Sequence, residues 1–134
     1  MKVVTICQPW AWAISAGHKT VENRTWAPSY RGPILIHAGS SMSWMKSGLE
    51  FLRSIGIEPD ERDLLYGRVI ALANLRDVLT YGEGDLFHDL KSDPFASGPK
   101  CWLLDGVSVL MSPFRLRGRQ GIFDIPDRKI ELRS

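Results

Sequence analysis

The sequence lacks the features that mark several large classes of protein. Only two cysteines, Cys7 and Cys101, occur in 134 residues, and each lies in an apolar run. They therefore indicate buried thiols in a reducing compartment rather than a disulfide framework. No apolar run approaches the ~20 residues that span a membrane, and Met1–Lys2 leads straight into a strand-like run instead of a secretory leader. We expect a soluble cytoplasmic protein with no membrane partner.

Several catalytic and cofactor motifs are also missing. The chain has no glycine-rich phosphate loop of the P-loop or dinucleotide type, no nucleophile elbow and no metal-binding helix motif. The cysteines lack the spacing of metal ligands, and His18, His37 and His88 form no cluster along the sequence. We therefore expect neither a cofactor nor a metal site.

Composition and length are those of one globular domain. The chain is 44% hydrophobic and 24% charged, so we expect a single domain over residues 1–134 with a C-terminal tail at 126–134. The net charge of +2 does not indicate nucleic-acid binding, but the charge is unevenly distributed. Residues 115–134 are predominantly basic and residues 83–93 acidic. This fits either a solvated mixed surface or a basic face for a phosphate-bearing partner.

Short β-branched and apolar runs predict most of the strands. Strands are expected over residues 3–7, 19–26, 33–38, 68–80 and 101–104. For residues 68–80 a helix is the competing interpretation, because the apolar run is nearly continuous. A further apolar run follows residue 104, and Pro113 is expected to end it. Residues 114–125 are expected to form two more short strands.

Two helices are predicted from start and stop signals and from apolar spacing. Pro9 favours a helix start and Gly17 a left-handed stop, so one helix is expected over 9–16. Residues 42–56 repeat apolar side chains at helical spacing, and residues 84–91 allow at most a short helical turn. This mixed order does not fit regular βαβ alternation. It predicts an α+β fold, a small mixed β-barrel of about six strands with two or three flanking short helices.

A charged segment follows the first predicted helix. Side chains alternate along a strand, so Glu22 and Arg24 point the same way, and Lys19 can reach over the strand end towards Glu22. The segment is either a surface ion pair of a solvated hairpin, with a value of about 0–1 kcal/mol, or the polar end of a ligand cleft.

Other candidate residues are each open to two interpretations. Trp10 and Trp12 point to different sides of a helix and are either packing residues or lining of a groove. Gln8 lies at a helix start, where free backbone N–H groups can hold an anion. His37 is a strand histidine with a structural or functional role, and residues 115–121 are a solvated edge or an arginine-rich phosphate-binding segment.

The spacing Gly17-x-Lys19-x-x-Glu22-x-Arg24 resembles the GxKxxExR signature of the ASCH domain family, within the PUA-like superfamily. The resemblance extends over roughly residues 2–125 through four flanking segments. These are residues 8–11, 30–38, 67–71 and 101–104, which read QPWA, YRGPILIHA, GRVIA and CWLL. It implies a PUA-like barrel with a cleft beside the first helix, lined by the signature residues.

The resemblance implies several activities. Relatives are RNA-associated modules, some small members are amidohydrolases of N4-acylated cytidines, and ribonuclease activity is attributed to others. In the amidohydrolases, which resemble a K-T-x-T-x-R pattern, the lysine matching Lys19 is the nucleophile or base, and threonine stands where this chain has Glu22. The acidic residue of those enzymes comes from a later segment, for which Asp85 and Asp89 are candidates by region.

We therefore predict a domain that binds RNA, a nucleotide or a modified nucleobase. The alternatives are a hydrolase, either an N4-acylcytidine amidohydrolase or a single-strand ribonuclease, and a protein-interaction module. The candidate catalytic residues are Lys19, Glu22 and Arg24. The candidate ligand-binding residues are Gln8, Trp10, Trp12, Lys19, Glu22, Arg24, Trp26, His37, Arg117, Arg119 and Gln120.

Overall fold

A computed structural model of the chain describes residues 1–84 and 87–133. The strands are β1 (Lys2–Ile6), β2 (Val21–Arg24), β3 (Gly32–Ala38), β4 (Arg68–Thr80), β5 (Lys100–Arg115) and β6 (Ile122–Asp124). The helices are α1 (Trp10–Ser15), α2 (Met45–Ser54), the 3-10 helix η1 (Glu61–Asp63) and α3 (Phe87–Ser92). Residues 85 and 86, within the helical turn expected at 84–91, lie outside the described residues. No helix in the described part of the chain is long and apolar enough to cross a membrane.

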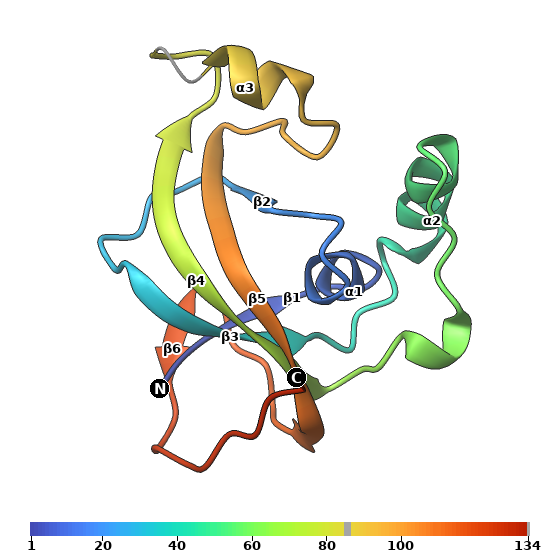
Figure 1. The fold of residues 1–134 in the computed structure, drawn as a ribbon, viewed down its shortest axis with the longest axis vertical. Coiled ribbons are helices and arrows are strands. Elements are labelled where there is room, and N and C mark those ends of the chain that lie inside the picture. The colour runs from blue at the N-terminus through green and yellow to red at the C-terminus, as the bar shows by residue number, and fades with distance from the viewer. Residues whose placement is uncertain (85–86, 134) are drawn as a thin grey trace.

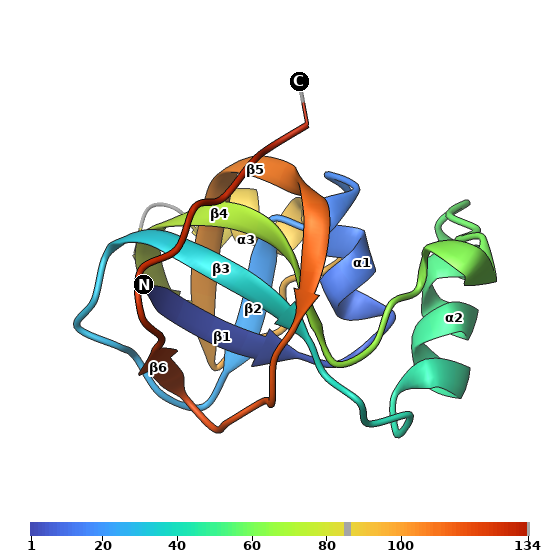
Figure 2. The ribbon, with the colours of Figure 1, turned by 90° about the horizontal axis from the view of Figure 1, so that it is seen from below.

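The strands form one curled sheet in the order β2-β5-β4-β3-β1-β6. β1 and β3 run parallel, and every other neighbouring pair is antiparallel. The long strands β4 and β5 bend across the molecule and give the sheet the shape of a half-barrel, with α1 against one side (Figures 1 and 2). The α+β fold class predicted from the sequence is confirmed, and residues 68–80 are a strand rather than a helix.

Alternation along the strands separates two cores. Ile34 and Ile36 point with α1 into the main cluster, which also contains Trp102. Leu35 points to the opposite face, into a second cluster with Val3. A period of two therefore places apolar side chains on both faces of β3, which explains why its sequence is a continuous apolar run.

The expected break at Pro113 is wrong, because β5 continues through it to Arg115. The register against β4 shifts there: Val69 pairs with Phe114, whereas Ala71 pairs with Val109. Pro113 therefore lies in a bulge. A bulged residue makes no ladder hydrogen bond, so the missing N–H of proline costs nothing there. On the far edge of β5, backbone hydrogen bonds join residues 109–111 to residues 131–133 of the tail.

The two short strands expected over residues 114–125 are also corrected. Residues 114 and 115 complete β5, and only β6 forms in the rest of the segment. Residues 116–121, which we call the basic loop, connect the two strands.

The α1 and α2 helices meet through a glycine. α1 ends as expected before Gly17, whose φ is 85°. α2 packs on α1 with buried Gly48 and Leu52, and a Cβ atom at Gly48 would lie 2.5 Å from the Pro9 ring. Glycine costs a helix interior about 1 kcal/mol relative to alanine, and here it permits the close approach that holds α2 beside α1.

Candidate ligand-binding site

A cavity of about 600 Å³ lies where β2, the end of β1, the first two helices and the segment before β5 meet. Its lining residues are Thr5, Ile6, Cys7, Trp10, Lys19, Glu22, Asn23, Arg24, Trp44, Ser47, Phe51, Pro94, Phe95 and Ser97. Cavities of this size suit ligands of nucleotide size, since small-molecule sites span roughly 300–1,000 Å³. The cavity therefore has the room that a small-molecule or single-nucleotide site requires.

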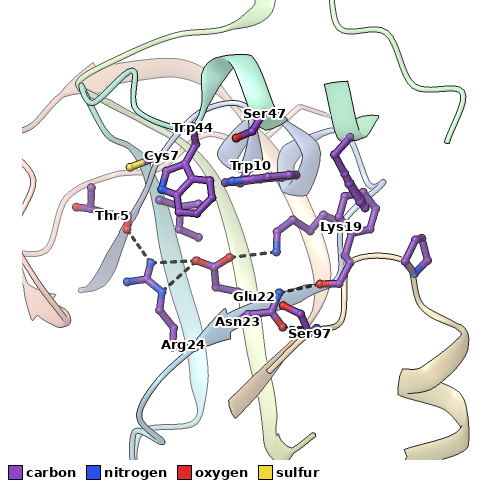
Figure 3. Close-up of a pocket in the computed structure, with 14 residues that line it drawn as sticks. Thr5, Cys7, Trp10, Lys19, Glu22, Asn23, Arg24, Trp44, Ser47 and Ser97 are labelled. Carbon is purple, nitrogen blue, oxygen red and sulfur yellow. Dashed lines mark hydrogen bonds and ion pairs between the residues drawn. The ribbon is translucent and has the colours of Figure 1, made fainter. Parts of the chain in front are cut away.

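The floor of the cavity is an ion-pair network centred on Glu22 (Figure 3). Lys19 Nζ lies 3.1 Å from Glu22 Oε1 and also donates to the Val21 carbonyl oxygen. Lys19 and Glu22 are only 3% and 8% exposed. The predicted reach of Lys19 over the strand end is confirmed. Its burial excludes a solvated hairpin, because a surface pair would leave both groups in water.

Arg24 closes the network on the other side of Glu22. Its Nε donates to Glu22 Oε2 over 3.0 Å, and its Nη2 donates to the Thr5 carbonyl over 2.9 Å. The guanidinium also lies over the Trp102 ring, 5.5 Å from its centroid. Glu22 and Arg24 share a face of β2, as the alternation predicts. Lys19 and Arg24 against Glu22 give the cavity lining two cations and one anion, a net charge of +1.

Aromatic rings form the wall at the Lys19 end. Phe51 and Phe95 are stacked with centroids 5.4 Å apart, and Trp10 meets both of them edge-on. Lys19 Nζ lies 5.9 Å from the Trp10 ring centroid and 5.8 Å from that of Phe95. Trp44, at 53% exposure, adds a ring at the rim. The cavity thus combines flat apolar walls with a cationic floor.

Asn23 fixes one wall of the cavity to β2. Its Nδ2 donates to the Phe95 carbonyl over 2.7 Å, and its Oδ1 accepts from the backbone N–H groups of Ser97 and Gly98 at 2.9 and 2.8 Å. One side chain on the strand that carries Glu22 and Arg24 therefore holds the segment that carries Phe95.

Asn23→Ala is expected to lower the free energy of unfolding by about 1–3 kcal/mol, because it leaves partly buried backbone groups without partners. Urea unfolding measures the change. Asn74→Ala is the matched control, since Asn74 makes an exposed hydrogen bond with Asp105 and its loss is expected to cost less than about 0.5 kcal/mol. Equal losses in the two variants would contradict the anchoring role of Asn23.

His37 lies outside the cavity and joins β3 to Thr5 and the basic loop. Its Nε2 lies 2.6 Å from the Leu116 carbonyl oxygen, which can only accept, so Nε2 carries the proton. Nδ1, 3.0 Å from Thr5 Oγ1, therefore accepts from that hydroxyl. Burial lowers the pKa of His37 from its usual 6.5, and the hydrogen bond to Leu116 opposes this shift less strongly. The ring is held in its neutral form.

We expect acidification to destabilise the fold through His37. The pKa of His37 is lower in the folded chain than its ordinary value of 6.5 in the unfolded chain. The contribution of neutral His37 to the free energy of unfolding is therefore complete at pH values above 6.5. The contribution is lost as the pH falls from there towards the folded value, because the unfolded state takes up the proton first. Urea unfolding at several pH values tests this. His37→Gln should flatten the pH dependence in this window, whereas an unchanged profile would contradict the assignment.

The other predicted ligand residues are placed as follows. Gln8 is fully buried, donates to the Leu65 carbonyl and accepts from the Trp12 N–H. Trp12 packs against His18, with ring centroids 5.4 Å apart. Trp26 is 39% exposed and meets Trp102 edge-on. None of Gln8, Trp12 and Trp26 lines the cavity.

The basic loop lies next to the Thr5 end of the cavity without lining it. The Arg119 N–H faces Thr5 Oγ1 at 3.4 Å, and a Cβ at Gly118 would lie 3.0 Å from the same oxygen. Arg117, Arg119 and Gln120 are exposed. Of the candidate carboxylates, Asp85 is outside the described residues and Asp89 is exposed and not part of the lining.

Several lining residues have no counterpart among the residues predicted from the sequence. These are Thr5, Ile6, Cys7, Asn23, Trp44, Ser47, Phe51, Pro94, Phe95 and Ser97. Alternation gives no signal for Asn23, since it places this residue on the opposite face of β2 from Glu22 and Arg24. Trp44, Phe51 and Phe95 carry none, because folding brings them from distant segments. In the described part of the chain no three His, Cys, Asp or Glu residues are grouped to hold a metal ion.

Comparisons with known proteins identify the family. Similar solved structures include the ASCH protein from Zymomonas mobilis, with 17% identity and a TM-score of 0.57 over 93% of this chain and 87% of that one. A point mutant of the same protein has 18% identity and a TM-score of 0.58 over the same shares. No curated protein matches the chain. The family model of the ASCH domain matches residues 4–98. The chain therefore belongs to the ASCH domain family, and its curled sheet is a PUA-like fold.

Proposed function

We propose that this protein binds RNA or a nucleotide in the cavity beside α1. The observation that carries the proposal is the meeting of the Lys19–Glu22–Arg24 network with a wall of aromatic rings in one cavity of about 600 Å³. Single-stranded nucleic acid is recognised by stacking of splayed bases on aromatic rings, together with hydrogen bonds and charge. The cavity brings aromatic rings, hydrogen-bond donors and charge together in its lining.

Family membership supports the same proposal. ASCH domains resemble other PUA-like modules that associate with RNA, and the signature residues of the family are the ones that meet at the cavity floor here. The solved structures share only 17–18% identity with this chain, so they support the fold but not the identity of the ligand. The proposed ligand rests on the residues of the cavity.

Trp44→Ala tests the proposal with little risk to the fold, because Trp44 is half exposed at the rim. Loss of one stacking ring is expected to weaken binding of a short single-stranded RNA about tenfold, within the 1–3 kcal/mol of a base–aromatic stack. Titration calorimetry at low salt measures this. Met111→Ala removes an apolar side chain of similar exposure (56%) outside the cavity and should leave the affinity unchanged. Equal effects, or no binding by the unaltered protein, would overturn the proposal.

A second candidate function is hydrolysis of an N4-acylated cytidine. The 3.1 Å contact of Lys19 Nζ with Glu22 Oε1 in a buried setting favours it, because a nucleophile beside a carboxylate is the arrangement that covalent catalysis uses. In the arrangement seen, however, Lys19 acts as an ion-pair partner of Glu22 and as a hydrogen-bond donor to the Val21 carbonyl. A nucleophile needs a free lone pair instead, so binding is the better-supported function.

Mass spectrometry distinguishes the two functions. The unaltered protein and Lys19→Met, with a native fold verified by circular dichroism, are incubated with N4-acetylcytidine. Hydrolysis would consume water and release cytidine and acetate. We expect no product from either protein, and product from the unaltered protein alone would establish the hydrolase.

A further inference from the structure

The hydrogen-bonding capacity left free in the network belongs mainly to its cations. Glu22 Oε2 already accepts from Arg24 Nε and lies 3.0 Å from Arg24 Nη2, and Oε1 is paired with Lys19 Nζ at 3.1 Å. In contrast, Nη1 of Arg24 has no hydrogen-bond or ion-pair partner among the described residues, and Arg24 is 25% exposed. Both N–H groups of Nη1 are available, and the lining carries a net charge of +1. A ligand that meets Arg24 must therefore present an acceptor, and an oxyanion satisfies it best.

The two ends of the cavity differ in chemistry. The rings of Trp10 and Phe95 lie near Lys19 Nζ, and Phe51 stacks on Phe95. Arg24 lies on the other side of Glu22, bonded to the Thr5 carbonyl (Figure 3). A planar ring fits the first end and a charged group the second. A nucleotide has this same division between base and phosphate.

Thr5 links Arg24 to the basic loop, since its carbonyl oxygen accepts from Arg24 and its Oγ1 faces the Arg119 N–H. The loop is fixed to Thr5 by the Arg119 N–H and to His37 by the Leu116 carbonyl. Arg117 and Arg119 are exposed and have no carboxylate within ion-pair distance in the part of the chain that is described. The Arg119 guanidinium lies over the Phe123 ring at 5.8 Å. A loop anchored at Thr5, next to Arg24, thus carries two guanidinium groups without a carboxylate partner among the described residues.

We propose that Arg24 forms a phosphate subsite and that Arg117 and Arg119 hold the next phosphate of the same strand. The base packs against the aromatic wall at the Lys19 end, and the nucleic-acid strand leaves the cavity over the basic loop. The ligand class is then a phosphodiester-linked single strand rather than a free nucleoside. This inference rests on the proposed function, since it assigns polarity to the same cavity.

Affinities for a graded series of ligands test the assignment. Uridine, uridine monophosphate, a uridine dinucleotide and a tetranucleotide are compared by titration calorimetry. We expect the monophosphate to bind about tenfold more tightly than the nucleoside, because one charge-assisted hydrogen bond contributes about that much to affinity. The longer nucleotides should bind more tightly again. The logarithm of their affinity should fall with the logarithm of the salt concentration, with a slope of about −0.7 for each phosphate neutralised.

The doubly substituted Arg117→Ala, Arg119→Ala protein should lose the gain from chain length while keeping the gain from the first phosphate. Lys129→Ala with Arg133→Ala removes the same charge from the exposed tail and should retain both gains. If nucleoside and monophosphate bind alike, the phosphate subsite is overturned although the proposed function stands. A chain-length gain that survives the loop substitutions would overturn the role of the basic loop. If no member of the series binds, the proposed function itself fails.

Discussion

Glu22→Gln is expected to lower the free energy of unfolding by about 3 kcal/mol, the lower end of the range for breaking a buried ion pair. Glu22 is the shared partner of Lys19 and Arg24, and Lys19 is only 3% exposed. The amide keeps the shape of the side chain but not its charge. Lys19 and Arg24 both lose their counterion, and Lys19 is too buried for water to replace it. Urea unfolding at neutral pH measures the loss.

The second substitution Lys19→Met makes this prediction specific. In the Glu22→Gln background it removes the buried cation that was left without a partner, so it should restore part of the lost stability. Glu58→Gln is the matched control, because Glu58 pairs with Arg53 at an exposed site and such pairs contribute about 0–1 kcal/mol. If Glu22→Gln costs no more than Glu58→Gln, or if Lys19→Met deepens the loss, the network is not held by paired charge.

Trp102→Ala is expected to destabilise the protein by about 3–5 kcal/mol, as is typical when a buried aromatic side chain is removed. Trp102 is 1% exposed within the main core. Its Nε1 donates to the Trp26 carbonyl over 3.0 Å, and its ring underlies the Arg24 guanidinium. The substitution therefore removes core packing and the support of the cavity floor together.

Trp44→Ala provides the comparison, since the same residue type is removed at 53% exposure. Its effect on stability should stay within about 0.5 kcal/mol, while its effect on binding is the one proposed above. Trp102→Phe should recover most of the packing but not the hydrogen bond to Trp26. Similar denaturation midpoints for Trp102→Ala and Trp44→Ala would contradict the placement of Trp102 in the core.

Local rules predict the parts of this protein that depend on neighbouring residues. The period of two along a strand places Glu22 and Arg24 on one face, and the structure confirms their contact with each other. Gly17 marks the end of α1 for the same kind of reason, since its φ of 85° suits glycine. The family signature adds that these residues belong together, but it does not supply the residues around them.

The rest of the site depends on contacts between distant segments. Phe95 reaches the cavity because Asn23, 72 positions earlier, holds its carbonyl, and Phe51 reaches it because Gly48 lets α2 approach Pro9. Pro113 is similar: whether it ends β5 depends on the register against β4, and the register shift is set by the whole sheet. No periodicity along one segment contains this information.

The most direct test of the central claim is a nitrogen–proton correlation spectrum of the tryptophan indole N–H groups during titration with a single-stranded RNA. The five tryptophans are natural probes, because Trp10 and Trp44 line the cavity while Trp12 does not. We predict that the Trp10 and Trp44 signals shift in proportion to ligand bound and that the Trp12 signal stays in place. Binding that moves Trp12 and leaves Trp10 and Trp44 unmoved would show that the cavity beside α1 is not where the ligand binds.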